Sequence, residues 1–137
     1  MRVALDTDVL VSAVATRGLS ADVFNLILAE HELVVGETVL SELRRVLGEK
    51  IKVPRKMIDE VIALLRQEAT VVKKAEELAV KIRDKTDLPV LSEAVAGNAD
   101  VLVTGDKDLL EIEQKVPLQI LSPRAFWEQI RKNSPQT

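Results

Sequence analysis

The sequence predicts an α/β fold in which helices cover both faces of a parallel sheet. Its short apolar runs, such as Val3–Leu5 and Val101–Val103, lack the polar alternation of a half-exposed strand and are typical of strands buried on both faces. Segments with apolar residues at helical spacing lie between these runs. Strands that alternate with helices along a chain favour a parallel sheet joined by right-handed crossovers.

The elements follow from apolar spacing and from residues that start or stop helices. The expected strands are Arg2–Leu5, Glu32–Val35, Thr70–Val72, Asp100–Thr104 and Leu118–Leu121. The expected helices are Ser20–Glu30, Glu37–Leu47, one that starts at Pro54, Ala75–Ile82, Leu88–Ala96, and a last one that follows Ser122-Pro123. Ser20, Asp87 and Ser122 are expected as helix caps, and Gly48 as a helix stop.

The composition is that of a globular protein, with 47% hydrophobic and 30% charged residues. We expect one domain over residues 1–132 and a disordered tail at 133–137. No apolar run reaches the roughly 18 residues of a membrane span, and no signal-peptide pattern opens the chain. The absence of Cys is compatible with the cytoplasm, so we expect a cytoplasmic protein without a membrane partner.

The same composition narrows the chemistry. A chain without Cys has no thiolate metal site, and one His, His31, disfavours a zinc site or a His-dependent triad. The net charge of −3 means that the overall field of the protein does not favour binding of nucleic acid. Basic residues nevertheless cluster, and these clusters are either solvated helix faces or a rim that contacts phosphates. The clusters are Arg44/Arg45, Lys50/Lys52/Arg55/Lys56 and Lys81/Arg83/Lys85.

Four short acidic segments are the strongest functional signal. They are Leu5–Asp8, Ser41–Leu43, Asp84–Asp87 and Thr104–Asp108. The first and last follow apolar strands, and open α/β sheets bind ligands just beyond the carboxyl ends of their strands. Two carboxylates about 4 Å apart repel by roughly 4 kcal/mol at an effective dielectric near 20. Protonation or a divalent cation relieves such repulsion, and oxygen ligands without His or Cys suit Mg²⁺ or Mn²⁺.

Each acid also has an ordinary structural interpretation. Asp6 and Asp8 can cap the segment that follows them, and Asp87 can cap a helix. Glu42 borders the apolar stripe of its helix, where it can pair with Arg44 or Arg45 instead.

The remaining polar residues of these segments have similar alternatives. Asp84 is a neighbour of the site or a solvated residue, and Asp106 and Asp108 can form an ordinary turn. Thr7 and Thr104 can donate to a carboxylate or phosphate, or satisfy backbone groups at a strand end.

Taken together, the four segments resemble the PIN-domain nucleases, especially the PIN-type (VapC-like) toxin components of toxin–antitoxin pairs. The resemblance covers nearly the whole chain and is most specific in Val3–Ala13 and Asp100–Leu110. It implies a three-layer α/β/α sandwich with a parallel five-stranded sheet of order 3-2-1-4-5. It also implies that one or two Mg²⁺ or Mn²⁺ ions are held by a quartet of acids. These are Asp6, Glu42, Asp87 and Asp106.

By the same resemblance, other polar side chains would lie beside these ligands. They are Thr7, Asp8, Asp84, Thr104 and Asp108. The family commonly has Asn in place of Asp8, and its third segment is commonly richer in Asp, often at the position of Thr86. We favour Asp87 over Asp84, because Val90 and Ala94 fit the helix that usually carries the family acid.

The implied reaction is hydrolysis of RNA phosphodiester bonds by an endoribonuclease, in which a metal activates a water molecule and neutralises charge in the transition state. Asp6, on the central strand, would be the natural bridge between two ions. An antitoxin protein and a second copy of the chain are the implied partners. With two Phe, one Trp and no Tyr, binding of RNA is expected to involve its backbone more than its bases.

Three alternatives remain open. A haloacid-dehalogenase-like phosphatase would use Asp6 as nucleophile and Asp8 as acid, although it needs its Thr and Lys on separate loops. A response-regulator receiver would need its phosphorylated Asp after the third strand. A PIN-like scaffold that binds RNA or protein without catalysis is disfavoured, because all four acids are present.

Overall fold

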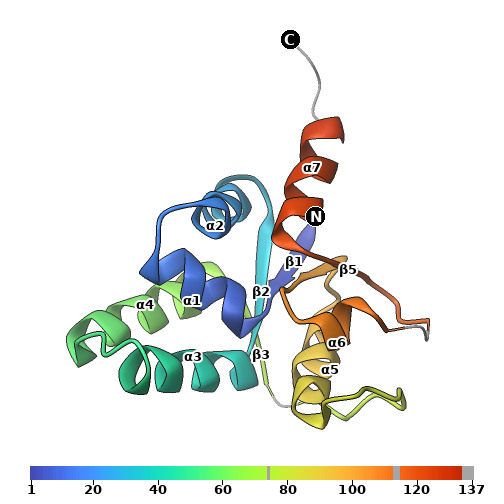
Figure 1. Ribbon diagram of the computed structural model, residues 1–137, viewed down its shortest axis with the longest axis horizontal. Helices are drawn as coiled ribbons and strands as arrows, with labels where there is room; N and C mark the ends of the chain where they lie inside the picture. The colour runs from blue at the N-terminus through green and yellow to red at the C-terminus, as the bar shows by residue number, and fades with distance from the viewer. Residues whose placement is uncertain (74, 113–114, 134–137) are drawn as a thin grey trace.

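A single five-stranded parallel sheet lies at the centre of the computed structural model, which describes residues 1–73, 75–112 and 115–133 (Figure 1). The strand order is β3-β2-β1-β4-β5. The strands are β1 (Arg2–Leu5), β2 (Glu32–Gly36), β3 (Thr70–Val72), β4 (Val101–Val103) and β5 (Gln119–Leu121). The predicted α/β class, parallel pairing and order 3-2-1-4-5 are therefore confirmed.

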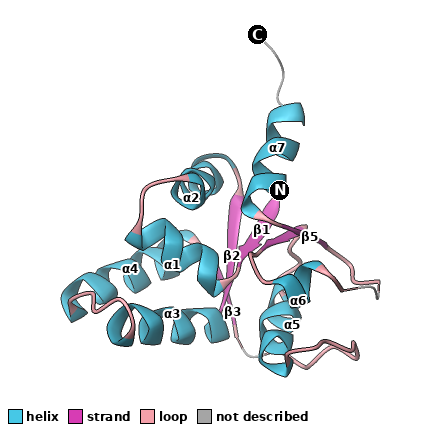
Figure 2. Cartoon of the chain, viewed as in Figure 1, coloured by secondary structure: helices cyan, strands magenta, loops and turns pink. Residues whose placement is uncertain are grey.

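Helices surround this sheet. They are α1 (Thr7–Ala15), α2 (Leu19–Glu30), α3 (Glu37–Glu49), α4 (Arg55–Glu68), α5 (Leu88–Ala96), α6 (Lys107–Leu110) and α7 (Pro123–Asn133). A 3₁₀ turn, η1 (Lys85–Asp87), leads into α5. Figure 2 shows the strands between α1 to α4 on one side and α5 and α6 on the other.

The two faces of the sheet are both apolar, which explains the continuous apolar strands. Alternate residues of β1 point to opposite faces. Val3 and Leu5 belong to a large cluster that includes side chains of α1 to α4 and Phe126 of α7. Ala4 belongs to a smaller cluster with α5, α6 and Leu102 of β4. The central strand is therefore buried from both sides, as expected for a three-layer sandwich.

One predicted helix is wrong. Residues Ala75–Ile82 form no helix, and Leu78, Val80 and Ile82 are partly buried against the smaller apolar cluster. These three residues alternate at a spacing of two, which is the spacing of extended chain. The backbone N–H of Leu78 donates to Ser92 Oγ at 3.1 Å, so a side chain of α5 replaces a helical partner.

Several helix boundaries also differ from the prediction. The turn after β1 is helical from Thr7, a helix that was not predicted, and α2 starts before Ser20, with Gly18 as its cap residue. Helix α3 continues through Gly48 to Glu49. Ser122 does cap α7, since its Oγ accepts from Ala125 N at 3.1 Å.

The predicted tail at 133–137 lies outside the described residues except for Asn133, which is the last residue of α7. Among the described residues, no single helix has both the length and the apolar composition to cross a membrane. One pair, α1 and α2, passes this test together, and it is bent by 102°.

His31 gives the packing of α2 against α7 a pH dependence. Its ring lies edge-on to Phe126, with centroids 6.4 Å apart, and both ring nitrogens lack a hydrogen-bond partner among the described residues. Burial lowers the pKa of His31 below its usual 6.5, and the nearby amino terminus lowers it further.

We expect this ring to make the protein less stable in mild acid. The unfolded chain binds a proton at His31 near pH 6.5, whereas the folded protein binds it only at lower pH. The contribution of His31 is thus fully present above pH 6.5 and is lost as pH falls towards the lowered pKa. Urea unfolding of wild type and His31→Gln from pH 8 to 5 measures it. A slope of stability against pH that is equal in both proteins would contradict this assignment.

Candidate functional site

The four predicted acids line one cavity of about 530 Å³ at the carboxyl edge of the sheet. Asp6 follows β1 and Asp106 follows β4, while Glu42 lies on α3 and Asp87 ends η1. Because β1 and β4 are parallel and paired, Leu5 lies beside Val103 and the two following turns meet. The apolar part of the wall comes from α1, α3 and the segment after α3. It consists of Val11, Ala15, Val46 and Ile51.

Asp6 is the most enclosed of the four, with 7% of its surface exposed. Its backbone N–H continues the sheet by donating to Val103 O at 3.0 Å. Its carboxylate accepts from Thr7 N at 2.7 Å and from Thr104 Oγ1 at 2.6 Å. Burial raises the pKa of Asp6, although the hydrogen bonds from Thr104 and Thr7 act in the opposite direction. Asp6 is therefore both the cap of α1 and a wall of the cavity.

Asp8 joins the turn after β1 to the turn after β4. Its Oδ2 accepts from the backbone N–H of Gly105 at 2.9 Å. A Cβ added to Gly105 would lie 2.5 Å from that oxygen, so the close approach requires glycine. Burial and the charge of Asp6 raise the pKa of Asp8 to about 6.

Glu42 faces the cavity from α3. Thr7 Oγ1 donates to Glu42 Oε2 at 3.2 Å, which connects the first acidic segment to the second. The structure shows neither of the ion pairs proposed as the alternative for Glu42. Arg44 pairs with Asp59 at 2.7 Å, and Arg45 lies 3.7 Å from Glu49.

Asp87 is left with an unused oxygen. Asp87 is the N-cap residue of α5, as predicted, but its side chain makes no capping hydrogen bond to the helix. Its Oδ2 is buried and has no hydrogen-bond partner among the described residues. Burial raises the pKa of Asp87 to about 7, and the negative charges of Asp106, Asp84 and Asp6 add to this effect. A buried acceptor with raised basicity is suited to a proton or a cation.

Thr104 links the strand end to the last acidic segment. Its Oγ1 donates to Asp6 and accepts from the backbone N–H of Asp106 at 3.0 Å. Asp106 in turn caps α6 by accepting from Asp108 N at 2.8 Å.

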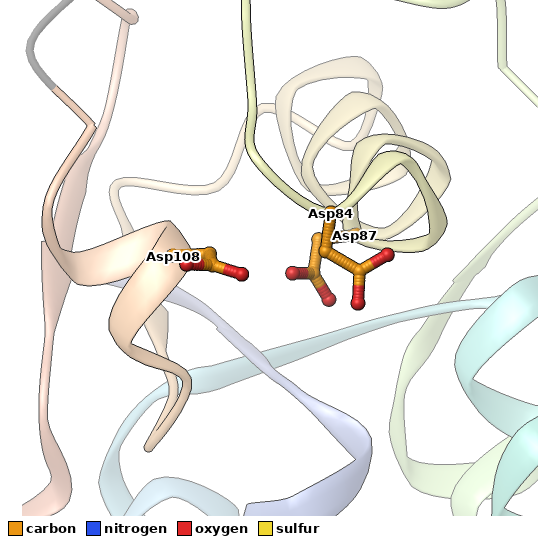
Figure 3. Close-up of side chains that lie close together, drawn as sticks. All are labelled: Asp84, Asp87 and Asp108. Carbon is orange, nitrogen blue, oxygen red and sulfur yellow. The ribbon is translucent and has the colours of Figure 1, made fainter.

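A second acidic group lies beside the cavity (Figure 3). Among the described residues, Asp84, Asp87 and Asp108 are the one set of three whose ligand oxygens all lie within 4.8 Å of one another. Asp84 and Asp87 come from the segment leading into α5, and Asp108 points towards them from α6. The other three predicted acids, Asp6, Glu42 and Asp106, do not converge to this distance, and Asp87 belongs to both groups.

Asp84 is the weaker member of this group as a cavity residue. It is exposed, and it accepts from Thr86 N at 3.0 Å and Thr86 Oγ1 at 2.7 Å. These hydrogen bonds lower the pKa of Asp84. Thr86 and Asp87 line the cavity, whereas Asp84 does not.

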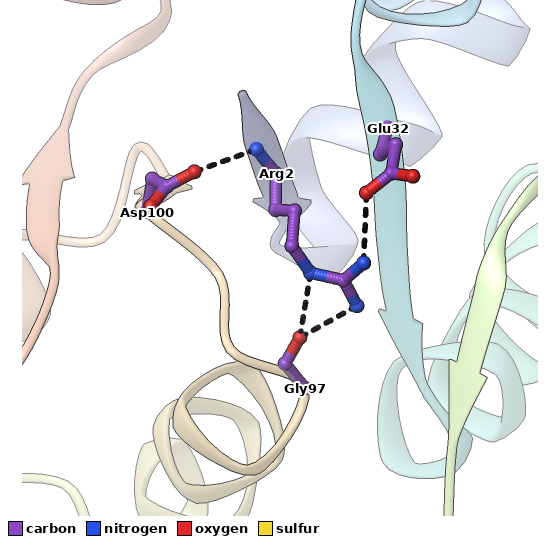
Figure 4. Close-up of polar contacts among 4 residues, drawn as sticks. All are labelled: Arg2, Glu32, Gly97 and Asp100. Carbon is purple, nitrogen blue, oxygen red and sulfur yellow. Dashed lines mark hydrogen bonds and ion pairs between the residues drawn. The ribbon is translucent and has the colours of Figure 1, made fainter.

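At the opposite edge of the sheet, the charged side chains of Arg2, Glu32 and Asp100 have polar partners (Figure 4). Arg2 donates to Gly97 O from Nε and Nη2, and its Nη1 pairs with Glu32 at 2.8 Å. The carboxylate of Asp100 accepts from the backbone N–H of Arg2 at 2.8 Å. Glu32 at this edge therefore has a cationic partner, whereas Asp6, Asp8 and Glu42 at the cavity accept hydrogen bonds from neutral groups.

Glu93 was missed by sequence reasoning. It lies on α5, is 2% exposed, and accepts from both the backbone N–H and the hydroxyl of Thr38 at the start of α3. Gly36 is the N-cap residue of α3 and offers no side-chain cap, and a Cβ there would lie 2.8 Å from Glu93 Cβ. Glu93 thus caps α3 from another helix and fixes the element that bears Glu42 against the element that follows Asp87. The sequence offers one signal for this contact, which is that Gly36 precedes α3 and cannot cap the helix with a side chain of its own.

The residues of this site fit a hard divalent cation. All donors are oxygens, Asp87 Oδ2 has no partner among the described residues, and burial raises the pKa of Asp6, Asp8 and Asp87. Mg²⁺ and Mn²⁺ prefer carboxylate oxygens, and their charge would remove the cost of gathering these groups.

We expect Glu93→Ala to destabilise the protein by about 1–3 kcal/mol, because Thr38 loses its partners in a partly buried place. Urea unfolding at pH 7 measures this cost. Glu76→Ala, at an exposed position, serves as the control and should change stability by less than about 0.5 kcal/mol. Equal effects of the two substitutions would refute the capping role.

We expect Asp8→Asn to raise the Tm of the metal-free protein at pH 7. The substitution removes repulsion with Asp6 and leaves an amide oxygen to accept from Gly105 N. The raised pKa of about 6 means that the charged form costs stability as pH rises through 6. The gain should therefore be largest above pH 6 and shrink towards pH 4, as followed by thermal unfolding in EDTA. A lower Tm in the variant at pH 7 would be the opposing result.

Comparisons with known proteins agree with this geometry. The PIN-domain family model matches residues 2–108, and no curated protein matches the chain. Among solved structures, that of VapBC2 from Rickettsia felis bound to a DNA fragment from their promoter has a TM-score of 0.63 and 19% identity, covering 88% of this chain and 97% of that chain. VapBC-1 from nontypeable Haemophilus influenzae has a TM-score of 0.65 and 21% identity, covering 90% of this chain and 99% of that chain.

At these identities the two structures establish the likeness of the fold. The family model spans most of the sequence and includes Asp6, Glu42, Asp87 and Asp106. This chain therefore belongs to the PIN-domain family of nucleases.

Proposed function

We propose that this protein is a metal-dependent endoribonuclease that hydrolyses phosphodiester bonds in RNA, and that one domain over residues 1–132 carries the activity. Asp6, Glu42, Asp87 and Asp106 hold one or two Mg²⁺ or Mn²⁺ ions in this proposal. The observation that supports it most directly is that these four acids, which are far apart in the sequence, line the same cavity.

The chemistry follows from the donors and from what surrounds them. A divalent cation bound there supplies an activated water ligand and neutralises charge on the phosphate. Asp6 holds its carboxylate in one orientation through Thr104 and Thr7, so its position is fixed before a ligand binds. The raised pKa of Asp87, about 7, makes this carboxylate a site where cation and proton compete. Activity is then expected to fall below neutral pH.

We also propose that the protein works with partners. The structural neighbours are VapBC structures, which supports an antitoxin as one partner of this chain and a toxin–antitoxin pair as its context. A homodimer is the second expected assembly.

The phosphatase alternative gains no support. It needs a Lys near the nucleophile Asp6, whereas Lys107 is exposed and does not line the cavity. A PIN-like scaffold without catalysis is instead an outcome that the following experiment can reveal.

The test is cleavage of end-labelled single-stranded and structured RNA with Mg²⁺ or Mn²⁺, repeated in EDTA. We expect metal-dependent cleavage that falls about 100-fold or more in Asp6→Asn, because the substitution keeps the shape and removes a ligand charge. Absence of cleavage in wild type, or equal cleavage in Asp6→Asn, would contradict the proposal and leave a binding scaffold.

Two further variants decide between the acidic groups. If the cavity is the site, Asp87→Asn abolishes cleavage and Asp84→Asn retains most of it, since Asp84 does not line the cavity. Equal loss in both variants would move the metal towards the group formed by Asp84, Asp87 and Asp108.

A further inference from the structure

A positively charged loop borders the cavity between α3 and α4. Ile51 of this loop lines the cavity and is 46% exposed. The basic residues around it are all exposed, and none has an ion pair within the described part of the chain. They are Lys50, Lys52, Arg55 and Lys56. The loop and the first turn of α4 thus carry four cations without an ion pair among the described residues, and Lys50 and Lys52 flank Ile51 of the cavity wall in the sequence.

Neighbouring basic residues behave differently. Arg44 and Arg45 of α3 pair with Asp59 and Glu49, and Arg66 of α4 makes two hydrogen bonds to Glu37. The acids of α3 and α4 named here are therefore engaged by other arginines. Since the net charge of the chain is −3, the loop is a local departure from the charge of the whole protein.

The backbone of the loop departs from local preference at Lys52. Its φ is 60°, in the left-handed region that glycine adopts without strain. The loop is held in this shape because Ile51 N donates to Val46 O at 3.1 Å and Val53 N donates to Leu47 O at 2.8 Å. Among the described residues, the other non-glycine residue with positive φ is Asn98, at 56°, and asparagine tolerates this conformation. A lysine at such a position has a conformational cost that glycine would not have.

The first turn of α4 carries charges of the sign that a helix N-terminus disfavours. Arg55 and Lys56 lie in the first turn, where the helix dipole disfavours positive charge, and this turn contains no acid. Pro54 precedes the helix and provides no side-chain cap. An anion bound at the loop would offset both this repulsion and the cost at Lys52.

We propose that the loop from Lys50 to Lys56 binds the phosphate backbone of the RNA strand whose scissile phosphate enters the cavity, with Lys52 as a principal contact. This inference rests on the proposed ribonuclease function. The contacts are electrostatic, because lysine is a point charge for phosphate and the loop has no aromatic side chain on which bases could stack. The loop therefore sets affinity for the strand with little preference for its sequence.

Lys52→Gly separates this role from a structural one. We expect the substitution to raise Tm by about 3 °C, because glycine removes the strain. The same variant should bind a fluorescent single-stranded RNA about 5- to 10-fold more weakly in EDTA, with the slope of log K against log salt reduced by about 0.7. In the cleavage assay it should raise KM more than it lowers kcat.

Two control variants match these changes. Asn98→Gly replaces the other residue with positive φ, at the amino edge of the sheet, and Arg45→Gln removes a paired charge of α3. Both should leave RNA affinity and its salt slope within about 2-fold of wild type. Lys56→Gln should weaken binding as Lys52→Gly does, although it relieves no backbone strain.

The outcomes distinguish this inference from the proposed function. Suppose that wild type binds RNA and that Lys52→Gly and Lys56→Gln bind it with the same affinity and salt slope. This result would overturn the inference without affecting the proposed cleavage, and the loop would then be available to an acidic partner protein. Binding that depends on Lys52 without any metal-dependent cleavage would support the phosphate contact at the loop and refute the nuclease. Wild type that binds neither RNA nor single-stranded DNA would overturn both, and equal losses for RNA and DNA would assign the contact to phosphates of either polymer.

Discussion

Repulsion between carboxylates at the carboxyl edge of the sheet is the constraint on which the rest of this structure depends. Parallel pairing of β1 with β4 aligns Leu5 with Val103, so the acids that follow these strands must lie close together. Burial and neighbouring negative charge raise the pKa of Asp8 to about 6 and that of Asp87 to about 7. Gathering these groups therefore costs stability, and a divalent cation bound to them would remove that cost.

Neutral donors, rather than cations, hold the acids in place. Thr104 Oγ1 donates to Asp6, the backbone of Gly105 donates to Asp8, and Thr7 donates to Glu42. Glu93 extends this arrangement by capping α3 from α5. Hydrogen bonds from neutral groups orient a carboxylate and leave its negative charge available, whereas an arginine partner would neutralise it. The amino edge, where Arg2 pairs with Glu32, shows the other solution.

Much of the fold could be predicted, because its signals are local. Buried strands and amphipathic helices have characteristic spacings, and alternating elements favour the parallel sheet that the structure contains. The failures also have local causes. Leu78, Val80 and Ile82 alternate as in extended chain, and Ser20 follows the first residue of its helix. In both places the local sequence is compatible with two structures, and tertiary packing decides between them.

The sequence by itself determined the order of the elements and the identity of the acids, since strand spacing and residue chemistry belong to neighbouring positions. Only the tertiary structure decided which acids share the cavity and left Asp87 Oδ2 without a hydrogen-bond partner among the described residues. Asp6 and Thr104 are separated by 98 positions, and Glu93 and Thr38 by 55. Contacts over such distances depend on how helices pack against the sheet, which spacing along the chain does not encode. For the same reason Asp84 and Asp108, three and two residues from predicted ligands, form a separate group with Asp87 beside the cavity.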